Sequence, residues 1–130
     1  VRPTASLSLS GNFTWMAPRD VTNARDLARR PRNTINLAAD WQAPLKGLSL
    51  GVDFRLVSNA IDYNSAYNVA VGTIRNLPSY TLTTLRGAYD LTGQVQLFAR
   101  LENVGDSRYQ TAFGYNTPGR SAYAGLRVKY

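Results

Sequence analysis

Strict alternation of apolar and polar residues in several segments constrains the fold of this chain more than any other feature. In 5–16, Leu7, Leu9 and Trp15 share one side with other apolar residues, whereas Ser, Asn and Thr occupy the other. Because successive side chains of a β-strand point to opposite faces, this period of two predicts strands with one apolar and one polar face. Six such strands are predicted, at 5–16, 33–42, 48–57, 80–89, 94–101 and 122–130. Segment 80–89 alternates least regularly, which predicts a bulge or a shift of register there.

The connections between these segments alternate in length. Short connections at 43–47 and 90–93 carry turn residues such as Pro44, Gly47 and Gly93. Long connections occupy 17–32, 58–77 and 103–121. This rhythm is typical of outer-membrane barrels, which have short turns on the periplasmic side and long external loops. The sequence therefore predicts an all-β fold, an antiparallel up-and-down meander of about six strands forming part of a transmembrane β-barrel, with residues 1–130 as one segment.

The placement of charged residues supports this prediction. The charged residues within the predicted strands lie opposite the aliphatic side chains, as expected if the polar face lines a lumen and the apolar face meets lipid. These residues are Asp40, Asp53, Arg55, Arg86, Arg100, Arg127 and Lys129. The formal net charge of +7 comes from arginines divided between the polar face and the loops. Since no single aromatic-flanked basic patch results, a nucleic acid is not an expected partner.

Aromatic residues fall near both ends of the predicted strands. If the chain ends on the periplasmic side, Trp41, Tyr89 and Tyr130 lie at periplasmic ends, and Phe13, Trp15 and Phe54 lie toward external ends. Tryptophan and tyrosine favour the two membrane interfaces, where the ring is buried and the polar group stays hydrated. The pattern predicts two aromatic girdles.

Several classes of protein are excluded or disfavoured by what the sequence lacks. Without Cys or His there is no disulfide, no thiolate metal site and no histidine base, so we expect no catalytic, metal or cofactor site and no enzyme. No apolar run is long enough for a transmembrane helix, and no signal segment opens the chain, which we expect to start mid-protein or after processing. A soluble β-sandwich also has alternating strands. The twelve residues of 5–16 are long for a sandwich but suit a tilted membrane span, which needs about 9 to 11.

One segment resembles a known family. Residues 97–109 read LFARLENVGDSRY, similar to the penultimate strand and loop entry of TonB-dependent outer-membrane receptors. The matching positions are Asn103, Val104, Asp106 and Tyr109, while Gly105 stands where the family often has Phe. Segments 27–41 and 77–91 fit the same family, so the resemblance covers nearly the whole chain, from about Arg2 to Tyr130. It implies that residues 1–130 form the C-terminal part of such a β-barrel, without the plug domain.

The end of the chain suggests a subtype. Within 111–130, the residues Gly114, Tyr115, Pro118, Gly119 and Arg120 look most like the last loop of vitamin B12 receptors, with siderophore receptors next. The final strand is an alternating apolar ladder that ends in Tyr130, similar to the signal read by barrel-assembly machinery, although Phe is the usual last residue.

The resemblance implies active uptake of a scarce, large nutrient, cobalamin or a ferric siderophore, through a barrel of about 22 strands in the bacterial outer membrane. Implied partners are membrane lipid, the remaining barrel, a plug domain, and TonB acting through an N-terminal part that this sequence does not contain. The calcium sites of B12 receptors belong to loops outside this segment, and the acidic residues lack calcium-loop spacing. A porin-like passive barrel and a soluble basic β-domain remain alternatives.

Two groups of polar residues are candidate contacts. Tyr and Asn clusters in the last two long loops combine rigid area with hydrogen bonding, which predicts ligand contacts. The predicted contacts are Tyr63, Asn64, Tyr67, Asn68, Tyr109, Tyr115 and Asn116, together with Arg120. The alternative is that these residues pack the loops together or serve the outer girdle. Charged residues on the polar face, namely Arg55, Arg86, Arg100, Asp40, Asp53 and Glu102, are predicted to form a ladder that holds the plug.

Overall fold

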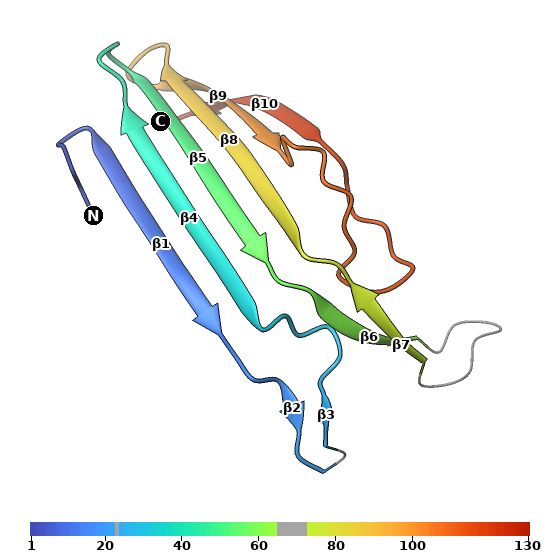
Figure 1. The fold of residues 1–130 in the computed structure, drawn as a ribbon. Helices are drawn as coiled ribbons and strands as arrows, with labels where there is room; N and C mark the ends of the chain where they lie inside the picture. The colour runs from blue at the N-terminus through green and yellow to red at the C-terminus, as the bar shows by residue number, and fades with distance from the viewer. Residues whose placement is uncertain (23, 65–72) are drawn as a thin grey trace.

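A computed structural model describes residues 1–22, 24–64 and 73–130, and its main feature is one antiparallel six-stranded sheet with the order β1-β4-β5-β8-β9-β10. Its strands are β1 (Leu7–Trp15), β4 (Asn33–Gln42), β5 (Leu48–Val57), β8 (Tyr80–Asp90), β9 (Val95–Glu102) and β10 (Ser121–Val128) (Figure 1). Each strand pairs with the next large strand along the chain. The predicted all-β up-and-down meander is confirmed. In the part of the chain that is described, no helix is long and apolar enough to cross a membrane.

Two small hairpins extend the long connections. β2 (Arg19–Asp20) pairs with β3 (Arg25–Asp26) in the first connection, and β6 (Ala60–Asn64) pairs with β7 (Thr73–Leu77) in the second. The sequence analysis did not predict these strands. All three long connections lie at one end of the sheet and both short turns lie at the other (Figure 1). We call 16–32, 58–79 and 103–120 the first, second and third long connections.

Against β5, strand β8 is regular, so the predicted bulge or register shift is absent from this pairing, whereas β9 pairs only with Leu85 to Asp90 of β8. The partners of β8 on β5 run without interruption from Tyr80↔Val57 to Tyr89↔Leu48. The sequence irregularity arises because Thr81 and Thr83 occupy the apolar face near the long connections. It reflects polar substitutions on that face and no inserted residue.

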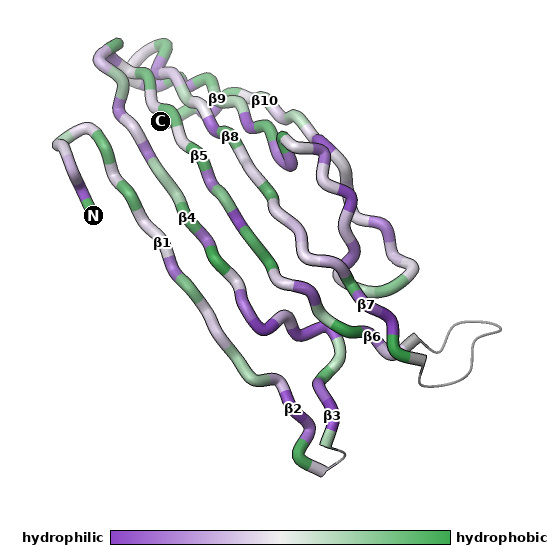
Figure 2. Tube along the Cα trace, viewed as in Figure 1, coloured by the Kyte–Doolittle hydropathy of each residue, from purple (hydrophilic) through white to green (hydrophobic). Residues whose placement is uncertain are grey.

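Within the described residues, no second layer covers the apolar face of the sheet. Leu37, Leu85 and Leu126 on this face are 51%, 44% and 62% exposed. Hydropathy alternates along the large strands (Figure 2), and the buried hydrophobic residues Val57 and Leu77 lie near the long connections. A soluble sandwich would bury this face between two sheets, so the exposure of the face favours a barrel wall over that alternative. An apolar surface that is exposed over such a continuous area is typical of a face that contacts a membrane or another part of a protein.

Aromatic residues mark both ends of the apolar face. Pairing aligns Trp41 with Leu7 and Leu50, and Tyr89 with Leu48 and Leu97, near the short turns. Phe13 and Trp15, which are 64% and 68% exposed, lie near the long connections. This arrangement agrees with the predicted pair of girdles.

Candidate functional site

The three long connections meet on one buried carboxylate, that of Asp62 in β6. Arg29 of the first connection donates through Nε to both carboxylate oxygens, at 3.0 Å each. The backbone N–H of Phe113, in the third connection, donates to Oδ2 at 2.8 Å. The backbone N–H of Arg29 also donates to the carbonyl oxygen of Ile61 at 2.7 Å. A single side chain in the second connection therefore holds the other two.

The charge on Asp62 is stabilised despite its burial. Burial raises the pKa of Asp62, but hydrogen bonds from the Phe113 amide and the Arg29 guanidinium outweigh this effect and hold the pKa below its ordinary value of 3.8. The side chain is therefore ionised at neutral pH. A buried carboxylate persists in this form only because its acceptor positions are filled.

A cavity of about 190 Å³ lies beside this contact. All three connections and the end of the sheet line it, through Arg29, Pro31, Arg55, Val57, Ser58, Ala60, Leu77, Pro78, Tyr80, Gln110 and Thr111. The Arg29 side chain is 56% exposed, whereas the Asp62 side chain is only 3% exposed, so the pair presents its positive partner outward. Among the described residues, none forms an ion pair with the guanidinium of Arg55. The cavity is therefore electropositive.

Tyr63 also joins the first two connections. Its hydroxyl donates to the backbone oxygen of Asp26 at 2.9 Å, and the Arg25 guanidinium lies 5.4 Å from the centre of its ring. A similar contact places Arg75 of β7 over the ring of Phe113 at 5.1 Å. In this structure Tyr63 packs one connection against another.

The segment that carries the family resemblance closes the third connection at its base. Asn103 is buried at φ 48°; its Oδ1 accepts the Ser107 N–H at 2.8 Å, and its Nδ2 donates to the Ser107 carbonyl at 3.0 Å. Asp106, at φ 51°, accepts the backbone N–H of Arg120 at 2.9 Å. A Cβ on Gly119 would lie 2.8 Å from the Asp106 carboxylate, so a glycine is needed there for this approach. Asn103 and Asp106 thus have structural roles.

Those predicted ligand residues that the structure describes do not form one cluster. Tyr109 stacks on Tyr80, with ring centroids 4.2 Å apart, and so packs against the end of the sheet. Tyr115 is 72% exposed, and Asn116 and Arg120 are also exposed. Asn64 ends β6, while Tyr67 and Asn68 lie outside the described residues. Ligand contact by this set stays a prediction.

Sequence reasoning did not identify Asp62 or connect it with Arg29. Their separation is 33 residues, and Phe113 lies 51 residues beyond Asp62. The available signal was an acidic residue between apolar neighbours in a connection otherwise rich in uncharged residues. That signal does not name its partners.

On the polar face of the sheet, the predicted charge ladder is partly neutralised within the sheet itself. Arg86 donates to Asp53 at 2.7 and 3.0 Å and lies 3.0 Å from Asp40. It reaches Asp40 across Gly51, where a Cβ would lie 2.9 Å from both charged groups. Arg100 pairs with Glu102 at 2.6 Å.

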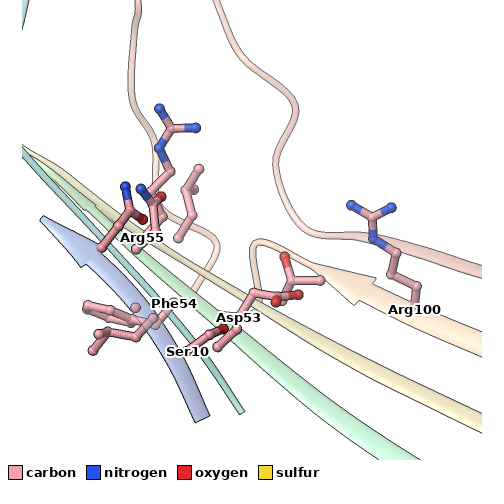
Figure 3. Close-up of a pocket in the computed structure, with 12 residues that line it drawn as sticks. Ser10, Asp53, Phe54, Arg55 and Arg100 are labelled. Atoms are coloured by element: carbon pink, nitrogen blue, oxygen red, sulfur yellow. The ribbon is translucent and has the colours of Figure 1, made fainter. Parts of the chain in front are cut away.

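Arg55 differs from these paired arginines. A hollow of about 590 Å³ on this part of the sheet is lined by residues that include Ser10, Asn12, Arg55 and Arg100. Figure 3 shows the side chains of Arg55 and Arg100 on the same side of the strands, with Phe54 on the other. Arg55 therefore adds an uncompensated positive charge to the polar face, close to the 190 Å³ cavity.

Comparison with known proteins identifies the family. The family model described as TonB dependent receptor-like, beta-barrel, matches residues 3–104. The chain belongs to this family. The family is one of receptors and not an enzyme class. One solved structure with a similar fold, the ferripyoverdine receptor of Pseudomonas aeruginosa, is a receptor of the outer membrane. The passive-porin and soluble-domain alternatives are therefore set aside.

Solved structures agree in fold. The siderophore receptor PirA from Acinetobacter baumannii superposes with a TM-score of 0.82 at 20% identity, over 98% of this chain and 20% of that one. A variant of the ferric enterobactin receptor from Pseudomonas aeruginosa, in complex with enterobactin, superposes with a TM-score of 0.79 at 26% identity. The match covers 98% of this chain and 21% of that one. The copper transporter OprC superposes with a TM-score of 0.75 at 17% identity, over 98% of this chain and 21% of that one. The chain spans about a fifth of each structure's length, and these matches lend no support to the predicted resemblance to vitamin B12 receptors.

Proposed function

We propose that the chain forms the C-terminal part of the barrel of an outer-membrane transporter that takes up an anionic ferric siderophore with energy from TonB. The family match over residues 3–104 is the observation that carries this proposal. The Asn103–Tyr109 segment and the alternating last strand support placement at the end of the barrel. Residues 1–130 would then supply six strands of wall and three long loops, while the plug and the TonB contact belong to other parts of the receptor.

In this proposal the apolar face meets lipid and the polar face lines the lumen. The long connections lie outside the cell and the C-terminus lies on the periplasmic side, because barrels of this class have long external loops and short periplasmic turns. Exposed leucines on one face and charged residues on the other support this orientation of the sheet. The hollow beside Arg55 and Arg100 would face the plug.

The charge of the long connections favours an anionic ligand. Together they contain eight arginines and four aspartates, a formal excess of four positive charges. Within the described structure, the side chains of Arg30, Arg108 and Arg120 form no ion pair. A surface of one sign raises the local concentration of ligands of opposite sign and speeds their association. Among the predicted ligand contacts in these connections, Tyr115, Asn116 and Arg120 are exposed and free to contact the ligand.

Cobalamin is the second candidate ligand, supported by the resemblance of 111–130 to the last loop of vitamin B12 receptors. Part of that resemblance has a structural explanation, since Gly119 and the amide of Arg120 contact Asp106. The positive charge of the connections gives no advantage for a ligand without net negative charge. We therefore rank a ferric siderophore above cobalamin.

Uptake by cells tests the proposal. The full-length receptor is produced in a strain that lacks other receptors of this family, with and without functional TonB. The cells receive radiolabelled iron as an anionic catecholate chelate or a neutral hydroxamate chelate, or labelled cyanocobalamin. We expect saturable, TonB-dependent uptake of the anionic chelate. TonB-dependent uptake of cyanocobalamin alone would assign the receptor to cobalamin, and uptake that persists without TonB would refute active transport.

A further inference from the structure

We propose that Asp62 is a positioning residue that fixes the three long connections to one another and orients Arg29, which forms with Arg55 a subsite for an anionic oxygen group of the ligand. The subsite rests on the proposed transport function, whereas the fixing of the connections does not. The two parts are therefore tested by separate measurements.

The contacts of Asp62 explain why it can fix all three connections. The first connection is also held to the second through the Arg29 amide and the Tyr63 hydroxyl. The third is held to the second by the Phe113 N–H, which donates to the Asp62 carboxylate, and by the Arg75 contact with the Phe113 ring. Among the described residues, Asp62 is thus a side chain that receives hydrogen bonds from both neighbouring connections. Removing its charge releases Arg29, and removing its oxygens also frees the Phe113 amide.

The same contact leaves part of Arg29 available. Only Nε is used by Asp62, and the two terminal nitrogens donate to none of the described residues. A guanidinium held from behind by a buried carboxylate presents a pre-oriented pair of donors, which suits a carboxylate or catecholate group. Arg55 supplies a second charge on the wall of the same cavity, and Tyr80 adds a hydroxyl.

The size of the cavity limits what it can hold. At about 190 Å³ it is smaller than the roughly 300 to 1,000 Å³ of sites that enclose a drug-sized ligand. It therefore suits one group of a larger chelate, while the rest of the ligand contacts exposed residues of the connections. A structural cavity that takes no ligand group is the competing outcome.

The fixing of the connections is measured in the ligand-free, full-length receptor. Because this chain has no cysteine, spin labels are placed at Val21 and Tyr115, which are 90% and 72% exposed, after any cysteines elsewhere have been replaced. We expect a narrow distance distribution in the parent protein and a broad one after Asp62→Asn or Asp62→Ala. Asp26→Asn is the matched control, because it removes an exposed ion pair within the first connection, Arg32–Asp26 at 2.8 Å. It should leave the distribution unchanged.

An unchanged distribution in Asp62→Ala would overturn the fixing role. Asp62→Asn preserves the shape of the side chain, so the test remains available if the alanine variant does not fold. Folding of each variant is checked by the heat-dependent shift in gel mobility that closed barrels show.

The subsite is measured by the affinity of the same receptors for ferric enterobactin, an anionic chelate, and for a neutral ferric hydroxamate. We expect Arg29→Gln and Arg55→Gln each to weaken binding of the anionic chelate by roughly ten- to hundredfold. Asp62→Asn should weaken it to a similar degree, and its combination with Arg29→Gln should add little, because the two residues act as a unit. The Asp26→Asn control should bind as the parent does.

Three outcomes separate the proposals. Unchanged affinity for the anionic chelate in both arginine variants would overturn the subsite, whatever the distances show. Equal loss for anionic and neutral chelates in both would also overturn it, since recognition would then not depend on ligand charge. If the parent receptor bound neither chelate, the siderophore function and the subsite would fail, and the distance measurement would still decide the role of Asp62.

Discussion

Replacing Asn103 by alanine should destabilise the folded receptor by about 3 kcal/mol. The side chain is 6% exposed and makes hydrogen bonds of 2.8 and 3.0 Å to the backbone of Ser107. Each bond contributes about 1 kcal/mol net, so their loss accounts for about 2 kcal/mol. The backbone lies at φ 48°, where asparagine is tolerated and alanine is not, which adds about 1 kcal/mol.

Denaturant titration of the full-length receptor, folded into lipid vesicles, measures this difference. The midpoint should fall in the Asn103→Ala protein with little change in slope, since the surface exposed on unfolding is similar. Asn59→Ala is the matched control because Asn59 is exposed, has no positive φ, and its side chain forms no hydrogen bond with any described residue. If Asn103→Ala lost no more stability than Asn59→Ala, the structural role assigned to the Asn103–Tyr109 segment would be refuted.

Three further predictions concern the sheet and the site. In the same titration, Leu85→Arg should lower the free energy of unfolding by about 2 to 4 kcal/mol. Thr84→Arg should lower it little, because Thr84 lies on the polar face beside Asp53. Equal losses would contradict the assignment of the two faces. Arg86→Gln should cost about 1 kcal/mol, because its two aspartates are about half exposed, and the cost should shrink at high salt; a salt-independent cost would argue against an electrostatic origin. The pKa of Asp62 is lower in the folded state than its ordinary value of 3.8. The stabilisation that the ionised carboxylate gives to the folded state should therefore be complete well above pH 3.8, and it should be lost as the pH falls below that value through the folded-state pKa. Distances between the spin labels should therefore broaden on acidification in the parent protein and stay constant with pH in Asp62→Asn.

The large strands could be predicted from sequence because a membrane barrel imposes a simple rule on every strand. One face must be apolar and the other polar, so the bounds of β4 and β5 agree with the predicted segments. In β8 the rule is weaker, because Thr81 and Thr83 lie on the apolar face near the long connections. The irregularity looked like a bulge in sequence, although the pairing of β8 with β5 is unbroken.

The hairpins in the long connections could not be predicted in this way. β2 and β3 have two residues each, too few to show a period, and they are joined to the second connection through side chains such as Tyr63. In the β6–β7 hairpin, Asp62 receives hydrogen bonds from Arg29 and from the Phe113 amide, which are both distant in sequence. Contacts of this kind depend on the assembled fold and leave no local pattern.

The candidate site shows the same limit. Counting Tyr and Asn residues selected Tyr63 and Tyr109, which the structure uses to pack the connections together or against the sheet. It passed over Asp62 and Arg29, because charge pairing across loops is a property of three dimensions. Family resemblance identified the class correctly, and the matching segment has a structural role in this chain, because Asn103 and Asp106 close the base of the third connection.

The most direct test of this account is the environment of successive residues along β8 in the full-length receptor, within a lipid bilayer. Single spin labels from position 81 to position 89 are compared for their collision rates with oxygen, which concentrates in lipid, and with a polar nickel complex. We predict that oxygen accessibility alternates with a period of two, with maxima at Thr83, Leu85 and Tyr89 and minima at Thr84 and Arg86. An absence of alternation, or maxima at Thr84 and Arg86, would contradict the conclusion that this sheet is the wall of a membrane barrel.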